Sequence, residues 1–363
     1  MQKASGKTLC DVLIEPSRAP AGSAAPQVQP YDVANMSLVC IDIALNGTGS
    51  IREKATDRFN ACHMEHHALL LWTNGTPTDW FPYIEFFDQR FTNNSTTWTG
   101  NIIVQYDPYS NAYPSLPKLP GISFDSPLVS RSGCTTNPAG HVPIILLPNP
   151  GSQDAADFSL SCSVATGSVG AKIPATVSYT GYFPGATPAP FSHTLSSAQA
   201  VRCDNFRGNI GAACVLPNVA GIATFDMTNP VHYLAATGYL YWQVHLQGYP
   251  GYLGPYGYGV PLVYTSNASV QTANTNTACG NFTPLYAGDQ CDEYPFKSTT
   301  NGASGKQYGV GWGRCSIPGD QNGQAGSVLA SAYRLQHITD GDNFYAQVVG
   351  DVALPPVVDR CTR

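Results

Sequence analysis

Short apolar runs alternate with turn-forming clusters through the first half of the chain. Runs of this length, bounded by Gly, Pro, Asn and Asp, are typical of antiparallel strands. The predicted strands are residues 36–44, 68–72, 102–106, 142–147, 158–165 and 175–182. Their spacing predicts an antiparallel β-sandwich-like domain over residues 31–195. Residues 1–30 are rich in Pro, Ala and Ser without a periodic apolar face, so we expect a flexible N-terminal segment there.

The second half of the chain, residues 196–363, has a different pattern. An acidic segment near residue 291 is followed by a run at 307–313 in which every second residue is glycine, which predicts a strand. The apolar residues between 328 and 333 share one side of a helix, which Asp320 or Asn322 can cap. Residues 344–349 are predicted to form a further strand. The order strand, strand, helix, strand predicts a small α+β domain.

Cysteine usage indicates where the protein works. The chain has 11 cysteines and none of them forms a Cys-x-x-Cys pair, which disfavours a zinc ribbon or a thioredoxin-like site. Only 12% of the residues are charged, and Ser, Thr and Asn are abundant. Dispersed cysteines in such a chain predict disulfides, an oxidising compartment and hence a secreted protein. No apolar run reaches transmembrane length, so we expect no membrane span.

Oxygen-bearing side chains gather at three places in the second half. The adjacent pair Asp292 and Glu293 comes first, Asp320-Gln321-Asn322 follows, and Asp340-Gly341-Asp342 closes the series. Carboxylate and amide oxygens suit hard divalent cations, so these places could converge on one ion. Taken alone, however, an acidic pair is more often a solvated turn, and Asp340-Gly341-Asp342 is more often a tight turn.

The residues around the acidic pair carry a family resemblance. The sequence QCDEYPFKST at residues 290–299 looks like the signature of the NucA/NucB deoxyribonuclease domain, found in secreted bacterial nucleases. Residues 322–329 resemble the helix entry of that family, and residues 338–345 resemble its closing strand. Residues 201–205 with 214–217 resemble a segment that precedes the nuclease core in longer members. The resemblance covers residues 196–350 and says little about the first half.

The resemblance implies a ββα-metal fold, similar to His-Me finger nucleases, with an aspartate in place of the usual histidine base. The implied activity is secreted, metal-dependent and largely sequence-nonspecific DNA cleavage with Mg²⁺ or Mn²⁺. Asp292 is the expected general base, and an aspartate near its usual pKa is ionised at neutral pH. Asn322 is the expected metal ligand, beside a helix N-terminus that favours phosphate.

Further residues receive roles from the same resemblance. Glu293 points to the face of the strand opposite Asp292, so only one of the two carboxylates faces the site. Ser327 is expected to orient ligand or phosphate, Asp340 and Asp342 to brace a turn, and Arg334 to substitute for a cationic phosphate contact.

Two disulfides are expected beside the resembling segments. Cys203 with Cys214, and Cys279 with Cys291, each close a short loop. In the loop-entropy description such a closure contributes about 3 kcal/mol.

Other functions stay open at this point. The net charge of −6 argues mildly against DNA binding, although a bound cation would itself contact phosphate. The main alternative is an extracellular glycan- or surface-binding β protein with a degenerate nuclease fold, and another is a coat or adhesin protein stapled by disulfides. Trp72, Trp80 and Trp98 could contact glycan, although core packing is the default. The run at 63–67 (HMEHH) lacks the His-Glu-x-x-His spacing, so satisfied or surface histidines are expected there. No obligate protein partner is indicated.

Overall fold

The computed structural model describes residues 7–15, 37–46, 49, 51–125, 128–138, 143–182, 190–206, 211–254, 257–305, 311–350 and 358–362. The chain divides into two compact units, Met1–Leu216 and Pro217–Arg363. This division lies further along the chain than the boundary predicted near residue 195, because strand β12 (Phe191–Asp204) continues through that position and pairs with β11 (Ile173–Tyr182). The mainly β class predicted from the sequence is confirmed.

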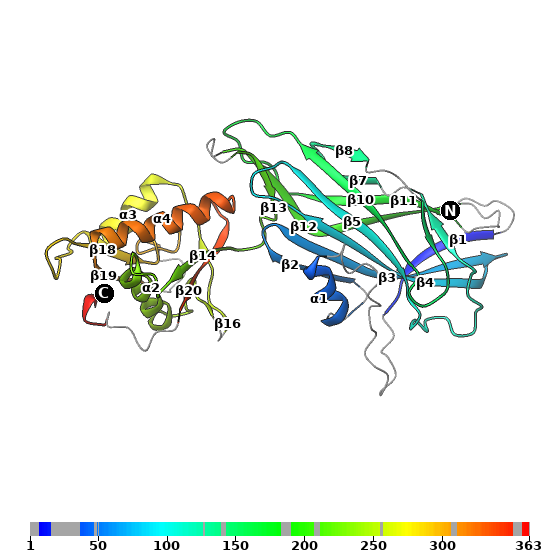
Figure 1. Ribbon diagram of the computed structural model, residues 1–363, viewed down its shortest axis with the longest axis horizontal. Helices are drawn as coiled ribbons and strands as arrows, with labels where there is room; N and C mark the ends of the chain where they lie inside the picture. The colour runs from blue at the N-terminus through cyan, green and yellow to red at the C-terminus, as the bar shows by residue number, and fades with distance from the viewer. Residues whose placement is uncertain are drawn as a thin grey trace. The chain divides into compact units, whose positions relative to one another are not determined.

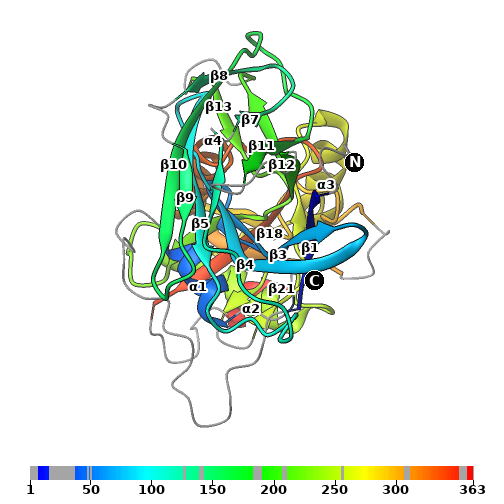
Figure 2. The same cartoon turned by 90° about the vertical axis from the view of Figure 1, so that its right-hand side faces the viewer.

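Two curled antiparallel sheets form the first unit (Figures 1 and 2). The first sheet has the order β1-β3-β4-β5-β10-β8, and β2 pairs with β3. Its strands are β1 (Lys7–Leu13), β2 (Ile51–Asp57), β3 (Asn60–Thr73), β4 (Thr76–Arg90), β5 (Thr97–Tyr106), β8 (Cys134–Pro138) and β10 (Gln153–Cys162). The second sheet has the order β13-β12-β11-β6-β9, and β7 pairs with β11. Its remaining strands are β6 (Ile122–Phe124), β7 (Leu128–Ser130), β9 (Ile144–Leu146) and β13 (Ala213–Val215).

Two local predictions in this unit are wrong. Residues 36–44 were expected to form a strand, but helix α1 (Leu38–Asn46) begins within them. Val39, Cys40 and Ile43 follow helical spacing and pack on the outer face of β3 and β4. In addition, β1 forms within the segment expected to be flexible, because it pairs with β3 from Lys7↔Thr73 to Leu13↔His67. Residues 1–6 and 16–30 lie outside the described residues.

The tryptophans proposed as glycan contacts lie mainly in the core. Trp80 is 2% exposed and Trp98 is 1% exposed, and Trp72 is half-buried. Trp98 stacks on Phe91, and Phe158 meets its ring edge-on. Buried rings of this kind contribute to packing and leave little surface for a sugar.

Among the described residues, the second unit combines small sheets with three helices. Strand β20 (Asn343–Val349) pairs in parallel with β14 (Gly221–Asp226) and antiparallel with β17 (Leu262–Val263). A second sheet has the order β18-β19-β21, and β15 pairs with β16. These strands are β15 (Leu253–Gly254), β16 (Gly257–Tyr258), β18 (Asp289–Tyr294), β19 (Gly313–Pro318) and β21 (Cys361–Thr362). The helices are α2 (Tyr233–His245), α3 (Ala268–Cys279) and α4 (Gly319–Leu335), with a 3₁₀ turn at Val358–Arg360.

The core of this unit is aromatic and lies where α2 and α4 meet the two sheets. Its largest side chains are Phe225, Tyr239, Trp242, Tyr294 and Phe344. Helix α4 contributes a buried stripe of Ala325, Leu329 and Tyr333. The order strand, strand, helix, strand is therefore present as β18, β19, α4 and β20. The more specific ββα-metal assignment stays a prediction.

Two details of this order differ from the prediction. The described second strand, β19, begins at Gly313, and residues 307–310 of the glycine-alternating run lie outside the described residues. Helix α4 begins at Gly319 after Pro318, which makes no side-chain cap hydrogen bond. The prediction that Asp320 or Asn322 caps the helix is wrong, since both already lie in its first turn.

Five disulfides join ten of the cysteines. They are Cys40–Cys62, Cys134–Cys162, Cys203–Cys214, Cys279–Cys291 and Cys315–Cys361. The two predicted pairs are confirmed, and Cys10 on β1 is the free cysteine. Within the part of the chain that the structure describes, no helix is long and apolar enough to cross a membrane.

Candidate active site

Strand β18 carries the acidic pair and is held by strand pairing and by a disulfide. It pairs with β19 in antiparallel register, so that Asp292 lies opposite Cys315 and Glu293 opposite Arg314. The Cys279–Cys291 disulfide ties it to α3, and Cys315–Cys361 ties its neighbour β19 to β21. Because side chains alternate along a strand, this anchoring sets which carboxylate faces which helix.

Asp292 faces the aromatic core and is 7% exposed. The Tyr239 hydroxyl on α2 donates a hydrogen bond to Asp292 Oδ1 at 3.1 Å. Burial, followed by the charge of Glu293, raises the pKa of Asp292 well above its usual range, and the Tyr239 hydrogen bond opposes the rise. The expectation of an ordinary pKa at this position is therefore wrong. A raised pKa makes the carboxylate a stronger base once it is ionised.

Glu293 lies on the opposite face of β18, as the alternation predicts. Its Oε1 accepts from Thr275 Oγ1 of α3 at 3.4 Å, and its Oε2 lies 3.7 Å from Cys279 Sγ. Burial raises its pKa. The two neighbouring carboxylates therefore lie in different surroundings: Asp292 faces α2 and Glu293 faces α3.

Asn322 lies on the same side of the hairpin as Asp292. Its Nδ2 donates to Gln290 Oε1 at 3.1 Å. Gln290 precedes Asp292 by two residues on β18, and residues two apart on a strand share a face. The half-buried Asn322, in the first turn of α4, and the buried Asp292 thus belong to one face. Sequence reasoning missed the contacts of Gln290 and Tyr239, because Gln290 received no role within the signature segment and Tyr239 lies 53 residues before Asp292 on another helix.

Ser327 and Arg334 lie elsewhere on α4. Ser327 follows Ala325 by two residues, which places it about 200° around the helix from the buried stripe. Its hydroxyl is exposed and donates to the Gly323 carbonyl at 3.0 Å. Arg334 Nη2 donates to Ser331 Oγ on that outer side at 3.2 Å. The structure does not bring either residue to Asp292.

Asp340 and Asp342 are both engaged by hydrogen bonds from loop residues. Asp340 accepts hydrogen bonds from the amide and the hydroxyl of Ser266, just before α3. Asp342 is 2% exposed and its Oδ2 accepts from the Thr339 amide at 3.1 Å. Gly341 between them has a φ of +84°, which a turn of this kind requires. Both carboxylates are thus engaged by hydrogen bonds within the protein.

The residues around Asp292 fit a weakly coordinated hard cation. Within the described ranges, no group of three His, Cys, Asp or Glu side chains that could hold a metal includes Asp292. Mg²⁺, however, keeps several waters and needs only one or two protein oxygens besides the substrate phosphate. Asn322 has an amide oxygen that is not the atom engaged by Gln290, and Asp292 lies on the same face, so the donor set suits such an ion.

Residues 264–347 match the family Deoxyribonuclease NucA/NucB. The matched segment begins directly after β17 and runs through α3, β18, β19 and α4 into β20, and so contains every candidate site residue predicted from the sequence. The C-terminal part of this chain thus carries a match to the NucA/NucB deoxyribonuclease domain, which supports a nuclease function and implies DNA as the substrate. Nucleases of this family are in general metal-dependent. No curated protein and no solved structure matches the chain.

Proposed function

We propose that the second unit is a metal-dependent, largely sequence-nonspecific DNA endonuclease that acts outside the cell, with Asp292 as general base and Asn322 as metal ligand. The observation that carries the proposal is that the matched segment holds Asp292 and Asn322 on one side of the β18–β19 hairpin. Five disulfides support an oxidising environment.

The chemistry follows from the surroundings of Asp292. Its carboxylate takes a proton from water while the water oxygen attacks phosphorus. The bond from phosphorus to the leaving sugar oxygen breaks, and that oxygen takes up a proton from solvent. The Tyr239 hydroxyl keeps Asp292 Oδ1 in place during this transfer. Asn322 lies in the first turn of α4, and the positive N-terminal end of a helix favours a phosphate beside it. Mg²⁺ or Mn²⁺ held by Asn322 would stabilise the negative charge that develops on the phosphate.

The test is plasmid nicking by the purified, oxidised chain in Mg²⁺, Mn²⁺ or EDTA. We expect cleavage that EDTA abolishes. Asp292→Asn and Asn322→Ala should each lower the rate by at least about 100-fold, the lower end of what a general acid–base group contributes.

Ser327→Ala is the matched control, because Ser327 lies on α4 like Asn322 but on its outer side. It should keep the parent rate. Loss of cleavage in Ser327→Ala together with full cleavage in Asn322→Ala would reverse the assignment of the two positions. Absence of cleavage by the folded parent under every metal would refute the enzyme proposal.

A further inference from the structure

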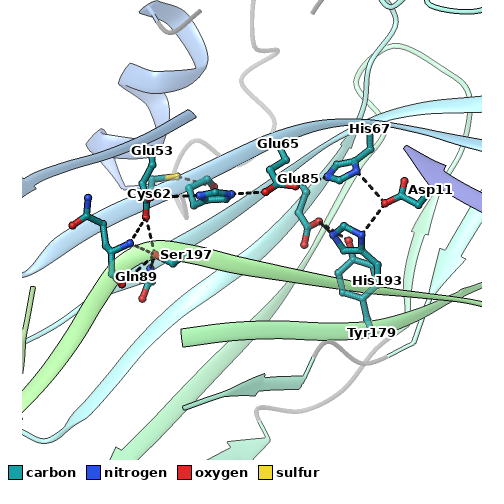
Figure 3. Close-up of polar contacts among 12 residues, drawn as sticks. Asp11, Glu53, Cys62, Glu65, His67, Glu85, Gln89, Tyr179, His193 and Ser197 are labelled. Carbon is teal, nitrogen blue, oxygen red and sulfur yellow. Dashed lines mark hydrogen bonds and ion pairs between the residues drawn. The ribbon is translucent and has the colours of Figure 1, made fainter. Parts of the chain in front are cut away.

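The first unit contains a row of acidic and basic side chains between its two sheets (Figure 3). Histidines and carboxylates alternate along it, from β2, β3, β1, β12 and β4 in turn. The contacts are Glu53–His63 at 3.7 Å, His63–Glu65 at 2.8 Å, Glu65–His67 at 3.1 Å, His67–Asp11 at 3.0 Å, Asp11–His193 at 2.7 Å and His193–Glu85 at 3.2 Å. The histidines expected to be satisfied or at the surface are thus buried and lie against carboxylates.

Three ligand atoms converge at the centre of this row. Asp11 Oδ2 lies 3.0 Å from His67 Nδ1 and 2.7 Å from His193 Nδ1. The three atoms lie within 4.8 Å of one another. They come from β1 and β3 in the first sheet and from β12 in the second. Two imidazoles and one carboxylate are a frequent protein ligand set for divalent first-row transition metals.

The hydrogen-bond geometry at His67 is incomplete. This side chain is 1% exposed, and both of its ring nitrogens lie near carboxylate oxygens. Nevertheless, among the described residues neither nitrogen has a partner in a hydrogen-bonding direction. A buried imidazole without directed partners is costly. A cation among the three ligand atoms would supply the missing interaction at Nδ1.

The surrounding carboxylates are placed as an outer shell. Glu65 Oε2 lies 3.1 Å from His67 Nε2, and Glu85 Oε2 lies 3.2 Å from His193 Nε2. Each histidine therefore has its second ring nitrogen beside a carboxylate, the arrangement that orients metal-bound histidines. The Tyr83 hydroxyl donates to Asp11 Oδ1 at 3.0 Å, and this bond leaves Oδ2 facing the two histidines.

The charge of the row favours a cation at its centre. Four carboxylates, Asp11, Glu53, Glu65 and Glu85, enclose three histidines. A divalent cation at the centre of the row would offset part of this negative charge.

We propose that Asp11, His67 and His193 form a zinc site that joins the two sheets of the first unit. Glu65, Glu85 and Tyr83 act as positioning residues for the ligands. This site is separate from the nuclease residues and does not depend on the proposed nuclease activity.

Zinc binding by the oxidised full-length chain tests the proposal. The chain carries Cys10→Ser, so that its free thiol binds no metal. After removal of metals, Zn²⁺ is titrated by calorimetry in excess Mg²⁺, and bound zinc is counted by elemental analysis. We expect one Zn²⁺ per chain and a rise in melting temperature of about 5–10 °C at saturating Zn²⁺. Co²⁺ bound in place of Zn²⁺ should give visible absorption bands.

Substitutions locate the ion. Asp11→Asn and His67→Gln should weaken Zn²⁺ binding at least about 100-fold, and Glu85→Gln by about 10- to 100-fold. His66→Gln is the matched control, because His66 lies on β3 and is buried but faces Asp107 at 3.5 Å on the other side of the sheet. It should keep the parent affinity.

The outcomes that overturn the proposal are distinct. A folded parent that binds no Zn²⁺ would show that Asp11, His67 and His193 do not form a zinc site. Equal zinc affinity in the parent and in Asp11→Asn would place the ion elsewhere. If circular dichroism shows that Asp11→Asn and His67→Gln do not fold, unchanged affinity in Glu85→Gln would refute the proposed shell.

Discussion

Replacing Tyr239 with phenylalanine removes one hydroxyl and keeps the ring that packs against Phe225 and Phe296. The hydroxyl donates to Asp292 Oδ1 and favours the charged carboxylate. Its loss therefore raises the pKa of Asp292 further. Because the base must be ionised, the acidic limb of the pH–rate profile should move to higher pH.

The size of the effect follows from the length of the bond. At 3.1 Å it is longer than a strong charged O–H···O bond of about 2.5–2.7 Å. We therefore take the lower end of the range for hydrogen bonds to charged groups, about 1.5 kcal/mol. This corresponds to about a tenfold change in the ionisation equilibrium. kcat/KM should fall about tenfold at pH values below the limb and stay unchanged on the plateau above it.

The assay is kcat/KM for cleavage of a defined duplex across the pH range in saturating Mg²⁺. Tyr294→Phe is the control, because its buried hydroxyl donates to the Pro250 carbonyl at 2.6 Å and accepts from Gln243 Nε2 at 3.0 Å, away from Asp292. It should lower the melting temperature without moving the limb. A profile of Tyr239→Phe that superimposes on that of the parent would refute Asp292 as the base.

Three further predictions concern the stability of the second unit. Burial raises the pKa of Asp292 in the folded state, so ionisation of Asp292 lowers the stability of the fold as pH rises through that pKa. In EDTA, Asp292→Asn should therefore raise the melting temperature by about 3 °C or more at neutral to alkaline pH. A gain that persists below pH 3.8, the ordinary pKa of the carboxyl group, would contradict this cause. Gly313→Ala would place a Cβ 2.1 Å from the indole ring of Trp242 on α2, and it should lower the free energy of unfolding by about 1–3 kcal/mol in denaturant titrations. Gly323→Ala has open space around it in α4 and should raise the free energy of unfolding by about 0.5–1 kcal/mol. Replacing Cys279 and Cys291 by serine should lower the free energy of unfolding by about 3 kcal/mol, and an unchanged urea midpoint would show that the disulfide does not stabilise the unit.

The hairpin and helix of the nuclease unit could be predicted because their patterns are local. Alternation along β18 places Asp292 and Glu293 on opposite faces, and the apolar residues of α4 share one side. The pKa of Asp292 could not be predicted in this way. It depends on Tyr239, 53 residues earlier on another helix, and on an aromatic core assembled from several elements.

In the first unit, too, contacts between residues far apart in the sequence could not be predicted. Residues 63, 65 and 67 visibly share one face of a strand, but their partners Asp11, Glu85 and His193 lie far apart in the sequence. Helix α1 was missed because a short apolar run fits a strand and a buried helix equally well. β1 was missed because only its pairing with β3, about sixty residues later, makes it a strand.

The connectivity of the disulfides has a consequence for processing of the chain. Cys40–Cys62, Cys134–Cys162 and Cys203–Cys214 lie within the first unit, and Cys279–Cys291 and Cys315–Cys361 lie within the second. All ten bonded cysteines therefore close loops inside their own unit, and the polypeptide at Leu216–Pro217 is the only covalent bond between the two. A single proteolytic cut there divides the oxidised protein into two separately cross-linked fragments, and the nuclease residues all remain in the C-terminal one.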